Sequence, residues 1–138
     1  MANEIQLEVV TPERRVLAEA VNSVTVPGRN GEMQILPGHA ALISELQTGV
    51  LAYNQGGTTQ QVHVSGGFIE VNNDKVSVLA EIAERPEEID VARAEAAKRR
   101  AEERIAKPSA DVDFERAQIA LVKSIVRLQV STRARTRV

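Results

Sequence analysis

The sequence lacks several of the residues on which common functional sites depend. Its 138 residues include no cysteine, which excludes disulfide bonds, thiolate metal sites and cysteine nucleophiles. Aromatic residues make up only 2% of the chain, so the core must be aliphatic and a base-stacking surface for nucleic acid is nearly excluded. No apolar run approaches the roughly 20 residues that span a bilayer, and no secretory signal is visible. We therefore expect a soluble, cytosolic protein.

Enzyme signatures are missing as well. Neither of the phosphate-binding patterns GxxxxGK[ST] and GxGxxG occurs, and Gly66-Gly67 does not open a predicted helix. His39 lies in a Pro-Gly turn and His63 in a predicted strand, too isolated from each other to indicate a metal site. A triad of Ser65, His63 and Glu70 lacks the sharp turn that exposes a nucleophile. We predict no catalytic residues and no bound metal.

A sharp change of hydrophobic period near Arg85-Pro86 divides the chain into residues 1–85 and 86–138. Before it, apolar residues alternate with a period near two in short runs separated by turns, the last run extending from Val76 to Ile82. About ten such strands indicate a β-sandwich or a barrel. After it, the sequence contains no glycine and the period approaches 3.6. We predict a C-terminal antiparallel two-helix hairpin joined at Pro108-Ser109.

The first predicted helix begins at Pro86 and ends near Ala106, with Glu87-Glu88 beside its positive end. Its apolar stripe consists mostly of methyl groups, so the helix should be held weakly by its own protein; the stripe is Ile89, Ala92, Ala96, Ala97, Ala101 and Ile105. Ser109 or Asp111 would cap the second helix. The second stripe is stronger and comprises Phe114, Ala117, Leu121, Ile125 and Leu128, flanked by Val122, Val126 and Val130.

Charge is distributed unevenly along the chain. Residues 1–85 hold 5 Lys+Arg against 10 Asp+Glu, a net of −5, whereas residues 86–138 hold 12 against 9, a net of +3. The end of the chain is basic, with Arg133, Arg135 and Arg137 following the last acid, Glu115. Such a tail favours phosphate, nucleic acid or an acidic protein face as a partner. A frayed, solvated chain end explains the same residues equally well.

Charged pairs on the two predicted helices form the best candidate ligand site. Asp90 and Arg93 stand at i,i+3 on the first helix, and Lys123 and Arg127 stand at i,i+4 on the second. In a folded hairpin these three cations and one carboxylate would converge, which suits a polyphosphate with a ribose or adenine contact. Solvated helix faces account for the same spacing without any ligand.

Three segments resemble the epsilon subunit of bacterial F-type ATP synthases in order and spacing: GEMQILPGHAALI, VSGGFIEVNNDKVSVLAE and ERPEEIDVARAEAAKRRAEERI. The resemblance covers essentially the whole chain. It implies an N-terminal β-sandwich and a C-terminal helical hairpin in a non-catalytic rotor subunit of the central stalk of a proton-translocating F1Fo ATP synthase. The subunit would be peripheral, at the cytoplasmic face of the bacterial plasma membrane.

The resemblance also implies partners. The sandwich would pack on the gamma subunit and the membrane c-ring, with Glu32 and His39 in the loop that approaches the ring. The hairpin would either fold or extend into the catalytic head of alpha and beta subunits and block ATP hydrolysis. In the extended form, Arg133, Arg135 and Arg137 would approach acidic segments of the beta subunits. Contact with the membrane would come only through the complex, and no nucleic acid is expected.

Some members of this family bind ATP in the folded hairpin through the motif [Ile/Leu]-Asp-x-x-Arg-Ala, which this chain matches. A supporting glutamate precedes the motif, and two cations, usually arginines, lie on the second helix. The corresponding residues here are Glu84, Ile89, Asp90, Arg93, Ala94, Lys123 and Arg127. The resemblance therefore implies no required cofactor, but ATP as a regulatory ligand. A stand-alone ATP-sensing module is the alternative function.

Overall fold

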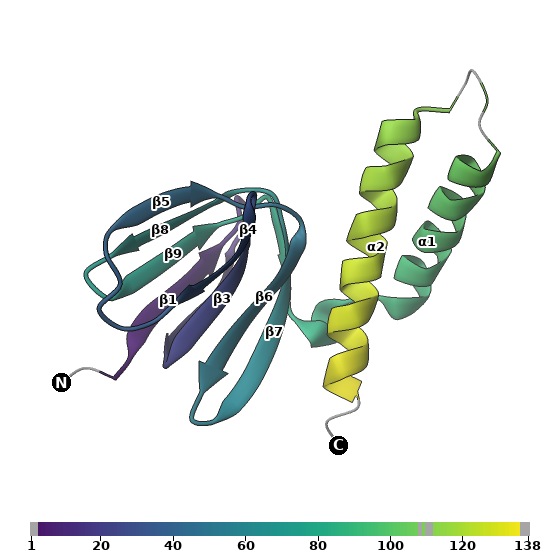
Figure 1. The fold of residues 1–138 in the computed structure, drawn as a ribbon. Coiled ribbons are helices and arrows are strands. Elements are labelled where there is room, and N and C mark those ends of the chain that lie inside the picture. Colours follow the sequence, from purple (N-terminus) through teal and green to yellow (C-terminus); the bar gives the residue numbers. More distant parts are fainter. Residues whose placement is uncertain (1–2, 108, 110–111, 136–138) are drawn as a thin grey trace. The chain divides into compact units, whose positions relative to one another are not determined.

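The chain forms two compact units, Met1–Arg85 and Pro86–Val138, in a computed structural model (Figure 1). Its described residues are 3–107, 109 and 112–135, with side chains described up to Thr132. Within them the first unit holds ten strands in two sheets and the second holds two α-helices, which confirms the predicted β-sandwich followed by a helical hairpin. Neither helix, over its described residues, is long and apolar enough to cross a membrane.

The sandwich consists of two five-stranded sheets. One has the order β2-β1-β9-β8-β5 and the other β10-β7-β6-β3-β4. All pairs are antiparallel except β1 with β9. The strands are β1 (Ile5–Val10), β2 (Arg15–Val21), β3 (Ser23–Gly28), β4 (Gly31–Ile35), β5 (Leu42–Glu45), β6 (Gly49–Gln55), β7 (Thr58–Ser65), β8 (Phe68–Asn72), β9 (Lys75–Leu79) and β10 (Ile82–Glu84).

The core lies between the inner faces of the sheets, because every second residue of a strand points to the same side. Both sheets contribute almost only aliphatic side chains, as the scarcity of aromatic residues predicts. Full burial of each is worth roughly 1.5–3 kcal/mol. The most deeply buried are Ile5, Leu7, Val9, Val21, Val24, Val26, Ile35, Leu51, Val62, Val64, Ile69, Val76 and Val78.

The predicted strand from Val76 to Ile82 is two strands that belong to different sheets. β9 ends at Leu79, and β10 begins at Ile82 and pairs with β7. Between them Ala80 is buried and donates its backbone N–H to the Val10 carbonyl. Because the buried alanine continues the alternation, the hydrophobic pattern does not reveal where the chain changes sheets.

The start of the first helix was predicted four to five residues too early. Pro86–Glu88 (η1) form a single 3-10 turn, and α1 spans Val91–Ala106. Asp90 has extended backbone angles, and its Oδ1 accepts a hydrogen bond from the Arg93 N–H at 3.0 Å. An N-cap of this kind satisfies one of the free N–H groups of the first turn and outweighs the preference of proline for the first helical position.

The second helix, α2, spans Phe114–Arg135 and is also capped by an aspartate. Asp113 Oδ1 accepts a hydrogen bond from the Arg116 N–H at 3.0 Å. The prediction of Ser109 as the cap is wrong, since the Ser109 carbonyl instead accepts from the Val112 N–H. Pro108 and the alternative cap, Asp111, lie outside the described residues.

Small residues recur along the buried side of both helices of the hairpin, and α1 and α2 pack against each other. These residues stand seven apart, or about two helical turns, and we call them the seam: Ala94 and Ala101 on α1 with Ala117, Ser124 and Ser131 on α2. The predicted stripes are therefore partly wrong. Ala92, Phe114 and Val122 are exposed, whereas Val126 and Val130, which flank the second predicted stripe, are buried.

Candidate partner-binding surfaces

An exposed apolar row crosses the outer face of the sheet that contains β1. Phe68 of β8 pairs with Leu79 of β9, which in turn pairs with Val10 of β1. Phe68 is 54% exposed and Leu79 is 53% exposed. Glu45 of β5 pairs with Phe68 and ends the row with a carboxylate. We call Val10, Leu79 and Phe68, with Glu45 at their end, the outer row.

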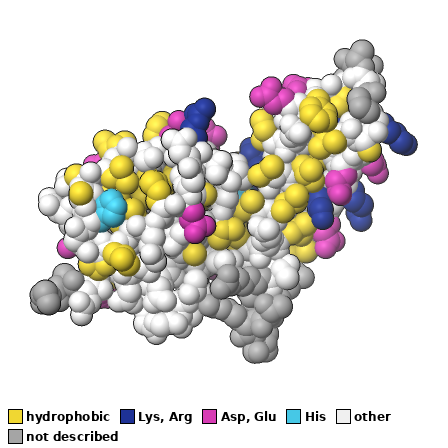
Figure 2. All heavy atoms as spheres, viewed as in Figure 1, with side chains coloured by type: hydrophobic (Ala, Val, Ile, Leu, Met, Phe, Trp, Pro, Cys, Tyr) yellow, Lys and Arg dark blue, Asp and Glu magenta, His cyan; other side chains and the backbone are white. Residues whose placement is uncertain are grey.

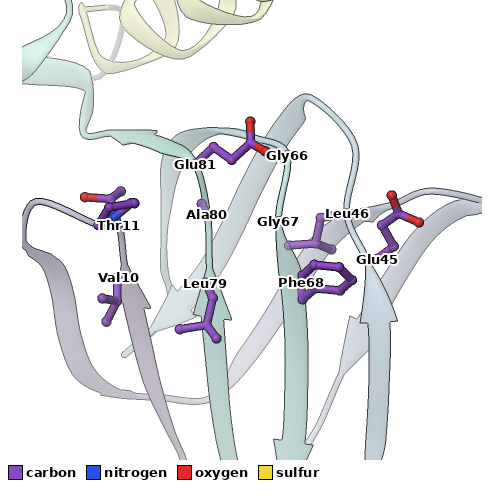
Figure 3. Close-up of a pocket in the computed structure, with 11 residues that line it drawn as sticks. Val10, Thr11, Glu45, Leu46, Gly66, Gly67, Phe68, Leu79, Ala80 and Glu81 are labelled. Atoms are coloured by element: carbon purple, nitrogen blue, oxygen red, sulfur yellow. The ribbon is translucent and has the colours of Figure 1, made fainter.

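The outer row lines a hollow of about 610 Å³ at the end of these strands (Figure 3). Gly66 and Gly67, which connect β7 to β8, line its floor with positive φ angles of 68° and 108°. A Cβ on Gly67 would lie 2.0 Å from the Leu79 carbonyl oxygen, so no other residue fits at that position. The Ser-Gly-Gly segment thus shapes this surface through its backbone.

Sequence reasoning missed the outer row. Ile69 and Val71 of β8 are buried, whereas Phe68 of the same strand is exposed. The alternation contained the signal, because Phe68 shares its face with Glu70 and Asn72. Together with Leu79 and Val10, Phe68 forms a contiguous exposed apolar surface, which is a candidate contact site.

The residues predicted to approach a partner ring lie on β4 and in the turn that follows it. Glu32 is exposed on β4, and His39 is exposed in the turn that follows it. Leu36 to His39 form a type II turn: Pro37 takes the second position, Gly38 the third with φ 85°, and the His39 N–H donates to the Leu36 carbonyl at 3.2 Å. The conformation that presents His39 is therefore fixed locally.

The motif Ile-Asp-x-x-Arg-Ala has a structural explanation within the second unit. Ile89 and Ala94 are buried, and Asp90 caps α1 through the N–H of Arg93. The Arg93 side chain is exposed and leaves its charge available to a ligand. Three of the four motif residues thus stabilise the start of α1, whether or not a nucleotide binds.

The second-helix cations lie toward the same end of the hairpin as this motif. The 16 residues of α1 are about 24 Å long, so α1 runs beside the first 16 residues of the antiparallel α2 (Figure 1). Lys123 and Arg127 lie in the second half of that stretch, and both side chains are half-buried. The fold therefore brings them to the part of the hairpin where α1 begins with Asp90 and Arg93.

Glu84 is engaged within the sandwich. It lies on β10 opposite His63 of β7, and its Oε1 is 2.8 Å from His63 Nδ1. The imidazole is fully buried, and because a carboxylate oxygen accepts, the hydrogen bond assigns the proton to Nδ1. His63 Nε2 is buried without a hydrogen-bond partner among the described residues. The predicted role of Glu84 in supporting a nucleotide must compete with this bond.

The seam of the hairpin contains hydroxyl groups whose hydrogen bonds remain inside one helix. Ser124 donates to the Leu121 carbonyl at 2.9 Å, and Ser131 donates to the Leu128 carbonyl at 3.0 Å. Both hydroxyls would therefore keep their acceptors if the two helices separated.

The predicted tail residues are only partly described. Arg133 and Arg135 lie in α2, but their side chains are outside the described part, and Arg137 lies wholly outside it.

Two family descriptions match consecutive parts of the chain. Residues 4–86 match "ATP synthase, Delta/Epsilon chain, beta-sandwich domain", and residues 87–132 match "ATP synthase, Delta/Epsilon chain, long alpha-helix domain". The ATP synthase epsilon chain of Desulforamulus reducens is 47% identical over 131 residues, which cover 95% of this chain and 99% of that one. The epsilon chain of Nitratidesulfovibrio vulgaris is 48% identical over 130 residues, covering 94% and 97%.

Solved structures agree with these sequence matches. A chain of the Euglena gracilis mitochondrial ATP synthase, in a structure of OSCP, F1 and c-ring, matches with a TM-score of 0.79 and 27% identity over 99% of this chain and 84% of that one. A chain from the Tetrahymena thermophila central stalk and c-ring shares the fold, with a TM-score of 0.54 and 15% identity over 94% of each chain. The chain therefore belongs to the ATP synthase delta/epsilon family, as one of its epsilon chains, which are non-catalytic subunits of that complex.

Proposed function

We propose that this chain is a rotor subunit of the central stalk of a proton-translocating F1Fo ATP synthase, and that its sandwich docks on the gamma subunit through the outer row. The exposure of the outer row is the observation that supports docking. Phe68 and Leu79 each leave about half of their surface in water, and covering it would contribute roughly 1 kcal/mol per side chain. The similarity to a chain solved with F1 and a c-ring supports this partner.

Reassembly of a complex depleted of its epsilon chain tests the docking surface. Phe68→Asp places a charge at the centre of the outer row, and we expect it to weaken reassembly at least tenfold. Asn72→Asp is the matched control, because it adds the same charge to the same face of β8 outside the hollow. Equal reassembly of the two variants would show that gamma docks elsewhere.

Glu32 of β4 and His39 in the turn after it would meet the c-ring. Both residues are exposed, and the type II turn holds His39 in one local conformation. A fixed turn loses little conformational entropy on binding, which favours a contact that must persist while the rotor turns. The subunit would then sit peripherally at the cytoplasmic face of a bacterial plasma membrane, touching it only through the complex.

The hairpin would regulate the enzyme by opening and extending into the catalytic head, where it would block ATP hydrolysis. The seam side chains are small, so each adds little buried area to the folded form beside the buried Val126 and Val130. Apolar side chains form a band on the helical unit in Figure 2. Ile119 and Val122 of α2 are about half exposed. Such a band offers alpha and beta subunits a surface to cover, and the tail arginines would add charge.

Truncation after Arg85 tests the inhibitory role. The cut falls at the boundary between the two compact units, so the sandwich keeps all ten of its strands. We expect the depleted complex to reassemble with residues 1–85 and to hydrolyse ATP faster than with the full chain. Equal hydrolysis rates in the two reassembled complexes would remove the inhibitory half of the proposal.

ATP would act as a regulatory ligand of the folded hairpin, bound by Arg93, Lys123 and Arg127. A ligand that binds only the folded form stabilises it by RT ln(1+[L]/Kd), or roughly 2.7 kcal/mol at a hundredfold excess over Kd. That amount is comparable to what the small-residue seam contributes. Asp90 would orient the start of α1 through its cap and offer its second oxygen to the nucleotide.

Calorimetric titration of the full chain with ATP tests this site. Arg93→Ala should abolish binding, whereas Arg99→Ala, which removes an equally exposed cation from the middle of α1, should not. Lys123→Arg should strengthen binding, because a guanidinium meets phosphate oxygens with two parallel donors. Equal loss of affinity in the Arg93 and Arg99 variants would indicate only general charge attraction. If the wild type does not bind ATP at millimolar concentration, the motif serves only to start α1.

A further inference from the structure

The turn that presents His39 is rigid within itself, but its place on the sandwich needs a separate support. The turn lies in the connection that leaves β4 in one sheet and enters β5 in the other, so the ladders of neither sheet hold it. In a type II turn the N–H of the third residue is not used inside the turn. Here that donor, the Gly38 N–H, is bonded to Asp74 Oδ1 at 2.7 Å.

Asp74 lies in the two-residue turn between β8 and β9. Asn72 pairs with Lys75, and Asn73 and Asp74 have φ angles of 49° and 58°, the signature of a type I′ hairpin. Glycine is the favoured second residue of such a turn, because other residues are strained at positive φ. An aspartate here therefore costs stability that glycine would not, and a residue kept at such a cost indicates a function for its side chain.

We propose that Asp74 is a positioning residue for the ring-contacting turn, a role that rests on the proposed function of that turn. Its carboxylate accepts the Gly38 N–H and fixes the turn on the end of the β8–β9 hairpin. The hairpin is itself fastened to the sheet, since the Asp74 carbonyl accepts the Gln6 N–H at 2.9 Å. A single residue thus connects the turn to the central strands of the sandwich.

The β3–β4 hairpin, which precedes this turn in the chain, is also bonded to the sheet that bears the outer row. Arg29, at the tip of the β3–β4 hairpin, places one guanidinium nitrogen 2.8 Å from both carboxylate oxygens of Glu45, and its N–H donates to the Glu45 carbonyl at 3.0 Å. The span from Arg29 to His39 is therefore held at both ends on the sheet that bears the outer row. Within this span the β3–β4 ladder holds Glu32, and the bond to Asp74 holds the turn that carries His39.

Amide hydrogen exchange of the full chain tests the bond itself. Asp74→Gly removes the carboxylate and suits the left-handed backbone, so its thermal stability should equal or exceed that of the wild type. Asp74→Asn keeps an oxygen acceptor at the same place. We expect the Gly38 N–H to exchange about fivefold faster in Asp74→Gly and at nearly the wild-type rate in Asp74→Asn. Unchanged exchange in Asp74→Gly would overturn the proposal.

Affinity for the complex tests the positioning role. The full-length variants are titrated into ATP synthase membranes depleted of the epsilon chain. We expect Asp74→Gly to bind about fivefold more weakly despite its undiminished thermal stability, and Asp74→Asn to bind as the wild type does. Equal binding of all three would overturn the role of Asp74 while leaving the proposed function intact. Failure of the wild type to bind would overturn the proposed function and the positioning role together.

Discussion

Replacing Ala101 by leucine should open the helical hairpin. Ala101 is a seam residue with only 2% of its surface exposed, and leucine adds three carbon atoms at this buried position. Overpacking of a filled core costs typically 1–3 kcal/mol. The three alanine methyl groups of the seam contribute about 2.4 kcal/mol at roughly 0.8 kcal/mol each. The substitution therefore cancels a large part of the stabilisation of the folded hairpin by its own seam.

The open form should then become about 5–150-fold more populated, since 1–3 kcal/mol corresponds to that range. Helix propensity hardly changes, because leucine is nearly as good a helix former as alanine. Spin labels on exposed positions of α1 and α2 would report the separation of the helices. In the reassembled complex, the variant should inhibit ATP hydrolysis more strongly than the wild type, because more hairpins are free to extend.

Ala92→Leu is the control, because it makes the same change at an exposed position of the first turn of α1. It should alter neither the label separation nor hydrolysis. If Ala101→Leu leaves the label separation unchanged, the seam does not hold the hairpin closed. If the helices separate but inhibition stays at the wild-type level, opening does not control inhibition.

Three further substitutions test the sandwich and the caps, each by thermal or chemical denaturation of the full chain. Gly67→Ala should destabilise the first unit by more than about 3 kcal/mol, because its Cβ would collide with the Leu79 carbonyl; a smaller loss would show that the β7–β8 connection moves aside. Glu84→Ala should cost about 1–3 kcal/mol by removing the acceptor of the buried His63 Nδ1–H, and unaltered stability would mean that water replaces it. Asp113→Ala should cost about 0.5–2 kcal/mol in helix stability through loss of the α2 cap, and unchanged helix content by circular dichroism would contradict that role.

The strands were predictable because alternation and burial coincide in them. Ile5, Leu7 and Val9 alternate with polar residues and are almost completely buried. The outer row was less visible, because it joins residues from three strands and because Glu70 and Asn72, the neighbours of Phe68 on its face of β8, are polar. The crossing of β9 to β10 was hidden for a different reason, since the buried Ala80 continues the pattern across the gap.

The faces of the helices could not be predicted because alanine is common on several sides of α1. Ala92 is exposed and Ala94 is buried, and nothing in their chemistry distinguishes them. On α2 the buried seam includes two serines, Ser124 and Ser131, which hydrophobic patterns pass over. The start of α1 offered two competing signals, and the capping aspartate, Asp90, prevailed over the proline four residues earlier.

The candidate ligand site was only partly accessible from spacing. The i,i+4 spacing placed Lys123 and Arg127 on one face of α2, and the antiparallel hairpin brings them to the end where Arg93 lies. What spacing could not show is that Asp90 and Glu84 already have partners. The first is used by the helix start, and the second by a histidine buried in the neighbouring strand.

The three-residue strand β10 has a mechanical consequence for the connection between the two units. β10 is an edge strand held to β7 alone in its sheet, and the chain passes from it directly into the second unit. Any tension along the chain between the two units reaches the sandwich there, where Glu84 grips His63 and the Arg85 guanidinium grips the Val16 carbonyl at 3.1 Å. These two side-chain bonds therefore protect β10 from tension along the chain. They must break before a force on the second unit can separate β10 from β7.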